Sequence, residues 1–461
     1  MKKLLTGITC VMLLALMLVS CGGKKAENAP ATPKVETKAK TETVAPKTEA
    51  TAPVATDRSK YEVTEPIEIV WWHALENQYA DTVTEIVDGF NNSQNLIKVK
   101  AEYIGNYATV NESLVAAQAA GTGLPAVVVA NTPYVAQYGA SGLCEDLTPY
   151  AQAFDYDFTD FGDGMMRASS YGGKQIALPF LISTQVMYYN KDMADELGIT
   201  IPEKFADMED MLKTVAEFND DGSTALWGTI IPGWDQWYFE TFFLNNGSKL
   251  INEDGLSTDL GDKAGVETTK TIKRWIDEGL AYFAVGKDAS SIMRQNFIDQ
   301  KAFSVIHTSS LYNTYVNKCK DFEVGMAWLP AADTKNQEIG GCVLLIPAKN
   351  DQKVKNAAWQ FLSYLCSKEV NMKWADETGY MPTRKSVLNT AEGLDFLQRK
   401  PAFKCIFDNL DYINPRIQHP AWNEFATIWK NYLAEIYIEK TNVDSSIKDM
   451  VVEMNEVLED Y

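Results

Sequence analysis

Few side chains in this sequence of 461 residues are arranged for covalent or metal chemistry. The three histidines, His73, His307 and His419, are widely separated, which argues against a histidine-rich metal site. The chain contains no G-x-S-x-G elbow, no H-E-x-x-H, no Walker loop and no G-x-G-x-x-G after a strand. Glycoside hydrolysis by a pair of carboxylates stays open as an alternative, because the sequence does not show the distance between two carboxylates in space. We therefore expect no metal and no cofactor, and binding in place of catalysis.

Aromatic side chains are more informative. The chain has 11 Trp, 21 Tyr and 19 Phe. The C–H faces of sugars and glycerol backbones pack on aromatic rings, while their hydroxyls bind planar polar groups. Trp234 and Trp237 are three residues apart, which places them on one side of a helix if the segment is helical. We expect Trp234, in a predicted loop after Pro232 and Gly233, to stack on a ligand, whereas Trp237 fits core packing equally well.

The N-terminus predicts export and lipid attachment. Lys2 and Lys3 precede an apolar run over 10–19, which is shorter than the roughly 20 residues that a membrane-spanning helix needs. Cys21, after a serine and before two glycines, has the form of a bacterial lipobox cysteine, which is diacylated and becomes the mature N-terminus. The alternative is an ordinary signal peptide with an incidental cysteine. We assign 1–20 to a signal peptide and expect the protein on the outer face of a bacterial membrane, in the periplasm or at the cell surface.

Residues 21–60 form the lipidated cysteine and a linker. The stretch repeats Ala, Pro, Thr, Lys and Glu without an aromatic residue, so we expect it to be disordered. Residues 1–60 hold ten basic and five acidic residues, which leaves 32 basic and 57 acidic residues in 61–461. A body with about 25 excess negative charges repels nucleic acid and anionic lipid, so we expect no nucleic-acid partner.

Disulfide bonds are not expected in the body. Five cysteines remain after Cys10 and Cys21 are set aside, and no pair has the C-x-x-C spacing. Most of the five have apolar neighbours, where a thiol behaves as a small hydrophobic group.

The body alternates predicted strands and helices. Alternating residues predict strands over 67–71 and 97–103, and a continuous apolar run predicts a buried strand over 125–129. Helical spacing of apolar residues predicts helices over 83–90, 208–218, 358–365 and 447–458. This alternation indicates α/β layers with mostly parallel sheets, and about 400 residues suffice for two or three domain-sized cores.

Six segments carry a resemblance to a known family over essentially all of 61–461. They are IEIVWWHALENQY, EYIGNYATVNESLVAAQAAGTGLPAVVVAN, GGKQIALPFLISTQVMYYNKDM, DQKAFSVIHTSSLYNTY, VGMAWLPA followed by IGGCVLLIPAKN, and AAWQFLSYLCSKEVNMKWADETGYMPTRKSV. In order and spacing the chain resembles the extracellular solute-binding proteins of the sugar type (family 1), which serve ABC importers. It is most similar to the glycerol-3-phosphate-binding branch, and maltose-binding protein is a more distant relative.

The resemblance implies a two-lobed periplasmic-binding-protein fold of type II, with three hinge crossovers and the ligand between the lobes. The crossovers would lie near 177–179, 329–339 and 379–382. Lobe 1 would then combine 61–176 with 331–378, and lobe 2 would combine 177–330 with 379–461. Each lobe would be a mostly parallel sheet flanked by helices.

The resemblance also implies a set of ligand contacts. Glu76, after the W-H at the end of the first strand, would accept hydrogen bonds from ligand hydroxyls; a helix-terminal glutamate is the alternative. Gly341 would offer a backbone N–H, since only glycine lets the chain approach so closely. The other side chains that match the motifs of the branch are Tyr107, Ser183, Ser309 and Tyr380.

One segment departs from the branch. Where the branch has an arginine that meets the ligand, this chain has Gln418, and Arg416 lies two positions earlier. Because arginine is the natural fork for a phosphate, this shift places phosphate recognition in doubt unless Arg416 turns in. The alternative ligand is a neutral sugar, for which Gln418 would be the hydrogen-bond partner.

We therefore expect a lipid-anchored, monomeric binding protein of an ABC importer that delivers a sugar or related polyol to a membrane permease. Its ligand is a neutral sugar or, alternatively, glycerol 3-phosphate or a glycerophosphodiester. Two other classes of protein stay open, a glycoside-active lipoprotein enzyme and a surface adhesin.

Overall fold

The computed structural model describes residues 57–75, 79–332 and 334–461. The predicted signal peptide, Cys21, most of the predicted linker and Glu76 lie outside these residues. Within them, no helix is both long enough and apolar enough to span a membrane. The five body cysteines are all free in this structure.

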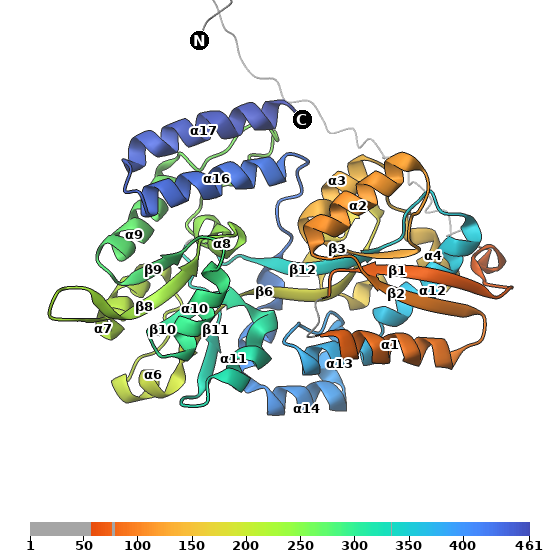
Figure 1. Ribbon diagram of the computed structural model, residues 1–461, viewed down its shortest axis with the longest axis horizontal. Helices are drawn as coiled ribbons and strands as arrows, with labels where there is room; N and C mark the ends of the chain where they lie inside the picture. Colours follow the sequence, from red (N-terminus) through yellow and green to blue (C-terminus); the bar gives the residue numbers. More distant parts are fainter. Residues whose placement is uncertain (1–56, 76–78, 333) are drawn as a thin grey trace, which may run out of the picture. The chain divides into compact units, whose positions relative to one another are not determined.

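Lobe 1 is built on three parallel strands. Strand β1 (Ile67–His73) lies between β2 (Ile97–Tyr103) and β3 (Val127–Asn131). Figure 1 shows α1 (Ala80–Ser93) and α13 (Lys368–Glu377) on one face of these strands, and α2 (Tyr107–Ala120) on the other. The core forms because each element turns one apolar side inward, for example Val83, Ile86, Val87 and Phe90 of α1.

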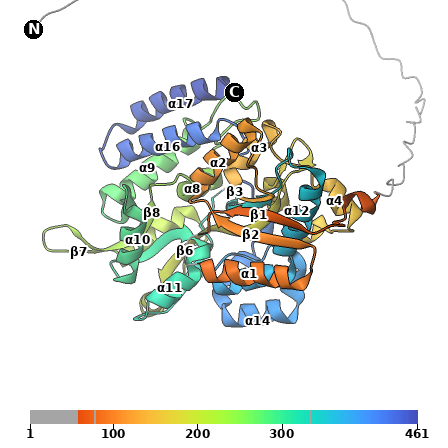
Figure 2. The ribbon, with the colours of Figure 1, turned by 45° about the vertical axis from the view of Figure 1, so that its right-hand side comes forward.

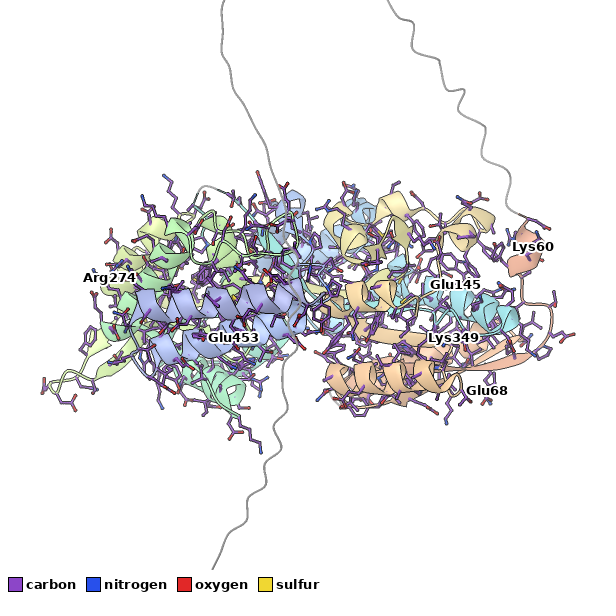
Figure 3. The ribbon with its side chains drawn as sticks, turned by 90° about the horizontal axis from the view of Figure 1, so that it is seen from above. Lys60, Glu68, Glu145, Arg274, Lys349 and Glu453 are labelled. Atoms are coloured by element: carbon purple, nitrogen blue, oxygen red, sulfur yellow. The ribbon has the colours of Figure 1, made fainter. Side chains whose placement is uncertain are left out.

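Lobe 2 is built on a second set of strands. Strand β8 (Thr224–Pro232) pairs in parallel with β9 (Ala281–Ala284) and β10 (Ala302–Thr308). Helices α16 (Trp422–Tyr437) and α17 (Val443–Glu459) lie side by side and pack on α9 (Lys263–Asp277), in both views of Figures 1 and 2. Figure 3 shows Arg274 and Glu453 on helices of this lobe, and Glu68, Glu145 and Lys349 on lobe 1.

Two strands pass through both lobes. Strand β6 (Leu178–Asn190) pairs with β12 (Gln337–Leu345) near its start and with β10 near its end. Met381 forms an isolated bridge to Ile182, so the third connecting segment lies beside the other two. Because β6 and β12 run antiparallel to most of their neighbours, the main sheet is mixed, while parallel pairs persist within each lobe.

Further helices and strands complete the described part of the chain. The remaining helices are α3 (Val135–Ala140), α4 (Thr148–Ala153), α5 (Asp163–Ala168), α6 (Lys191–Leu197), α7 (Met208–Val215), α8 (Trp237–Asn245), α10 (Ala289–Ile298), α11 (Tyr312–Lys318), α12 (Gln352–Leu365), α14 (Ala391–Arg399) and α15 (Lys404–Phe407). The remaining strands are β4 (Ser170–Tyr171), β5 (Lys174–Gln175), β7 (Glu217–Phe218), β11 (Val324–Ala327) and β13 (Ile413–Asn414).

The α/β prediction is confirmed, and one helix is shorter than its apolar spacing predicts. The helix predicted over 208–218 ends at Val215, because Phe218 pairs with Thr224 in an antiparallel hairpin. Phe218 is half exposed and takes no part in the helix core. The prediction for its position was therefore wrong.

Candidate ligand-binding cleft

A cavity of about 630 Å³ lies between residues of lobe 1 and residues of lobe 2. Its lobe 1 wall comes from α2, α3 and the turn before α3, and its lobe 2 wall comes mainly from the start of α16. Among the described residues that line it, Glu424 carries the one charged side chain. The lining residues are Asn111, Tyr134, Gln137, Ala140, Ser141, Gln236, Pro420, Asn423, Glu424, Ala426, Thr427 and Tyr461. Amides, hydroxyls and aromatic rings therefore face each other across the cavity.

Tyr107 and Tyr380 lie together, although 273 positions of sequence separate them. Tyr107 opens α2, where the side chain of Asn106 caps the helix by accepting from the Thr109 N–H. Burial raises the pKa of Tyr107 well above its ordinary value, and Cys342 and Tyr380 add to that shift. The Tyr380 phenol also has a raised pKa because it is buried, and it hydrogen-bonds with Tyr107 and Ser310. Both phenols are therefore neutral donors.

Ser183 and Ser309 lie where the connecting strands meet. Ser183 is buried in β6 opposite Gly340. The hydroxyl oxygen of Ser309 accepts from the backbone N–H of Thr184 at 3.2 Å, and its carbonyl oxygen accepts from the Tyr188 hydroxyl at 3.0 Å. Ser309 thus holds the turn after β10 against β6.

Two adjacent glycines of β12 permit close packing. Gly341 has φ +91°, and a Cβ there would clash with the carbonyl oxygen of Leu181. Position 341 thus requires glycine because the backbone of β12 passes close to the backbone of β6 there. At Gly340, a Cβ would lie 2.5 Å from Cζ2 of Trp237, so the indole rests on the backbone of β12.

The two tryptophans of the predicted pair have different surroundings. Trp237 is 5% exposed and belongs to the core of lobe 2. Trp234 lies in the loop between β8 and α8 and is only partly buried. Its ring makes edge contacts with Tyr238 and His307, at centroid distances of 5.6 and 6.1 Å. Part of Trp234 therefore remains accessible to a ligand.

Arg416 is 5% exposed and is already paired inside the protein. Its Nη2 donates to Oε1 of Glu240 at 2.8 Å. Burial acts to lower the pKa of Arg416, but Glu240, Asp235 and Glu338 outweigh it and raise that pKa. With its amide oxygen turned toward the arginine, Gln236 accepts a second bond from Nη2 at 3.0 Å.

Gln418 lies two residues beyond Arg416 and differs from it in hydrogen bonding. Its Nε2 donates to the Arg416 carbonyl oxygen at 3.2 Å. Its Oε1 is buried and has no partner within the described ranges. Oε1 of Gln418 can therefore accept a further hydrogen bond.

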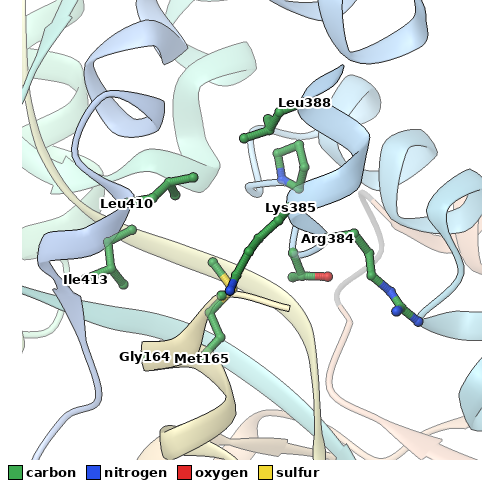
Figure 4. Close-up of a pocket in the computed structure, with 10 residues that line it drawn as sticks. Gly164, Met165, Arg384, Lys385, Leu388, Leu410 and Ile413 are labelled. Atoms are coloured by element: carbon green, nitrogen blue, oxygen red, sulfur yellow. The ribbon is translucent and has the colours of Figure 1, made fainter. Parts of the chain in front are cut away.

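A second cavity, shown in Figure 4, is too small for a sugar. Its volume is about 20 Å³, and Arg384, Lys385 and Ile413 are among the residues that line it. Arg384 is a structural cation, since its Nε donates to the Cys366 carbonyl oxygen at 3.0 Å and its guanidinium covers the ring of Phe161 at 4.0 Å. This cavity offers no ligand site of useful size.

The family model of the bacterial extracellular solute-binding proteins matches residues 85–404, which is more than half of the chain. The chain belongs to this family. A relative by sequence is the sn-glycerol-3-phosphate-binding periplasmic protein UgpB of Yersinia pestis bv. Antiqua (strain Antiqua). It is 24% identical over 350 residues, which cover 72% of this chain and 78% of the relative.

Two solved structures have a fold similar to that of this solute-binding protein. UgpB from Mycobacterium tuberculosis in complex with glycerophosphocholine superposes with a TM-score of 0.75 at 20% identity, over 86% of this chain and 99% of the other. The sugar-binding protein MalE from Xanthomonas citri gives 0.73 at 17% identity, over 86% and 98%. Both are type II periplasmic binding proteins, so the predicted fold class is confirmed.

In this solute-binding protein, contacts connect several of the predicted site residues that the structure describes, but none of the predicted residues in the described ranges lines the cavity of about 630 Å³. Tyr380 adjoins Tyr107 and also Ser310, which follows Ser309. Ser309 accepts a hydrogen bond from the backbone of Thr184, next to Ser183 in β6. The indole of Trp237 packs on Gly340, next to Gly341. Glu240, one helical turn beyond Trp237, holds Arg416, and Gln236 joins that pair to the cleft.

Sequence reasoning missed Gln236, Glu240 and Glu338. Glu240 had a visible signal, because it is the one carboxylate within the aromatic segment Trp-Tyr-Phe-Glu-Thr-Phe-Phe. A carboxylate among so many apolar residues is buried and paired far more often than exposed.

Proposed function

We propose that this solute-binding protein is the lipid-anchored receptor of an ABC importer, and that it binds a neutral sugar or related polyol in the cleft between its lobes. Its family supports a role in sugar or glycerophosphate import. The neutral ligand, the anchor at Cys21 and delivery to a permease are our proposals. So are the lobe limits of 61–176 with 331–378 and 177–330 with 379–461, which the crossings of β6 and β12 support.

The observation that carries the choice of ligand is the pairing of Arg416 with Glu240. A phosphate site needs a cation whose N–H groups are free to point at the ligand. Nη2 of Arg416 instead donates to Glu240 at 2.8 Å, and Asp235 adds further negative charge near the guanidinium. A phosphate at this place would meet more negative than positive charge.

Other buried cations are occupied as well. Within the described residues, the buried Arg384, Lys400 and Arg416 all bind protein groups; Lys400, for example, donates to the Asp376 carbonyl oxygen at 2.6 Å. The cavity lining, in contrast, offers amides, hydroxyls and rings. These groups suit the hydroxyls and C–H faces of a neutral saccharide.

The alternative ligand is glycerol 3-phosphate or a glycerophosphodiester. It is supported by the names of the relatives, one called a glycerol-3-phosphate-binding protein and one solved with glycerophosphocholine. Such a ligand would have to draw Arg416 away from Glu240. The two proposals therefore differ in the partner of Arg416 once ligand is bound.

Calorimetry separates these ligands. The purified body should be titrated with a disaccharide and with glycerophosphocholine at low and high salt. We expect saccharide binding that barely responds to salt, because no ion pair forms. Tight phosphodiester binding that weakens with salt would overturn the neutral ligand. Mass spectrometry of the molecule that co-purifies would name the ligand, and finding that molecule unchanged would argue against glycoside turnover.

A further inference from the structure

Glu240 of α8 and Glu338 of β12 are two glutamates buried around one arginine. They are 0% and 1% exposed. Their carboxyl groups are within hydrogen-bonding reach of each other, and Arg416 donates to Oε1 of Glu240 at 2.8 Å. Two buried acids therefore lie near one guanidinium, which donates to Glu240.

Hydrogen bonding leaves one oxygen of each glutamate and Nε of Arg416 without a partner among the described residues. Oε2 of Glu240 and Oε2 of Glu338 are both buried, and neither receives a hydrogen bond from the described part of the chain. Two ionised carboxylates are acceptors only, so they cannot satisfy each other. A proton held between the two groups makes one of them a donor. It also makes the cluster neutral, whereas two ionised carboxylates and one arginine leave a buried negative charge.

Among the described residues, Arg416 is the cation that acts on Glu338, and a second cation in the neighbourhood, Arg167, donates to the Asn414 side chain at 3.0 Å. The charged groups that act on Glu338 are Glu240 and Arg416, and Asp235 acts on Arg416. From β6, the Thr184 hydroxyl donates to the carbonyl oxygen of Glu338 at 3.1 Å. The neighbours from β12 and β13 are Gln337 and Asn414, which are neutral amides.

We propose that Glu240 and Glu338 share one proton at neutral pH, and that this proton joins helix α8 of lobe 2 to the strand β12 that crosses between the lobes. The cluster lies one side chain behind the cleft wall, because Gln236 both accepts from Arg416 and lines the cavity. Loss of the proton places an unbalanced charge beneath that wall. The shared proton thus makes the stability of the folded body depend on pH.

The sign of the dependence follows from burial. Burial and Glu240 raise the pKa of Glu338 well above 4.5, so the folded state keeps a proton that the unfolded state has released. The stabilisation is complete below about pH 4.5 and is lost as pH rises toward the raised pKa. Within that window, the equilibrium constant for unfolding of the wild type should rise about tenfold per pH unit from this group.

Glu338→Gln tests the proposal, because its amide donates to Glu240 as the protonated acid does but cannot ionise. Denaturant unfolding of wild type and E338Q should be compared at pH 5, 6, 7 and 8. As pH rises, the equilibrium constant for unfolding of the wild type should increase about tenfold per pH unit relative to that of E338Q. The variant should therefore be the more stable protein at pH 8. The control Glu253→Gln, at a side chain that is 97% exposed, should run parallel to the wild type.

A second measurement does not depend on the variant folding. In wild-type protein labelled with ¹³C at the glutamate carboxyl carbon, one resonance should have the chemical shift of a protonated acid at pH 7. Finding all carboxyl groups ionised at pH 7 would overturn the proposal. So would an E338Q that is destabilised by the same amount at every pH. Neither readout involves a ligand, so the outcome is independent of whether the ligand is a sugar.

Discussion

The indole of Trp237 lies directly on the backbone of Gly340, where a Cβ would come within 2.5 Å of Cζ2. The contact joins helix α8 of lobe 2 to the strand β12 that lobe 1 shares. Closely packed interiors respond to even one added methyl group. The lack of a side chain at Gly340 therefore determines how closely α8 can pack against β12.

Gly340→Ala should destabilise the body by ~1–3 kcal/mol, since a methyl group must displace a buried ring. Denaturant unfolding measures the change. Gly162→Ala is the matched control, because the nearest atom to its added Cβ is the flexible sulfur of Met165, at 3.2 Å. Equal stability of G340A and wild type would show that Trp237 can move at little cost.

Trp234→Ala should weaken ligand binding by ~1–3 kcal/mol, the scale of burying one large side chain, while the melting temperature changes little. Trp234 is only partly buried, in a loop at the edge of the core, so its loss should disturb packing less than loss of a fully buried ring. Trp237→Ala is the comparison, and it should cost ~3–5 kcal/mol of stability because this ring is a core residue. Calorimetry and thermal unfolding of both variants measure the two effects. If W234A unfolds early yet binds as well as the wild type, then Trp234 is part of the core and not of the site.

Gln418→Ala should weaken binding of a neutral ligand, because its buried Oε1 is an acceptor without a partner in the described residues. Loss of one such hydrogen bond typically costs ~0.5–1.5 kcal/mol. Arg416→Ala should instead lower stability by ~3–5 kcal/mol, since it leaves Glu240 buried and unpaired. Affinity is measured by calorimetry and stability by denaturant unfolding. An R416A protein that folds normally but loses affinity tenfold or more would favour a phosphate ligand.

Acid should destabilise the body through its buried histidines. Burial lowers the pKa of His73 to about 4, and burial together with Arg294 lowers that of His307 to about 3. Both stay neutral in the folded state while the unfolded chain takes up protons below about pH 6.5, so stability falls as pH drops from about 6.5 toward these values. Unfolding at pH 7, 6, 5 and 4 measures the slope. His307→Gln should be less stable at pH 7 but lose less stability on acidification, and an unchanged slope would contradict this assignment.

Cys21→Ala should release the protein from the membrane, because only a thiol can form the thioether to lipid. Membrane and aqueous fractions of a detergent phase separation, probed for the protein, give the answer. A variant at another cysteine, Cys405→Ala, should stay with the membrane. If C21A remains membrane-bound, the lipoprotein assignment fails.

Periodicity within the sequence determined much of the local structure. The helix predicted over 83–90 lies in α1, and the helix over 447–458 lies in α17, because their apolar residues recur on one face. The apolar stretch at 125–129 leads into β3, whose residues are almost all buried. Phe218 was placed wrongly because its spacing fits α7, whereas pairing with Thr224 in the sheet decides its position.

The environment of the site was decided by tertiary structure alone. The sequence shows Arg416 two positions before Gln418, and nothing near it in the chain shows whether its charge is free. The folded protein pairs it with Glu240, 176 residues earlier, and adds Glu338 from a crossing strand. Charge, burial and hydrogen bonding at a site depend on groups that are distant in sequence, so only the packing of α8, β12 and the segment after β13 determines them.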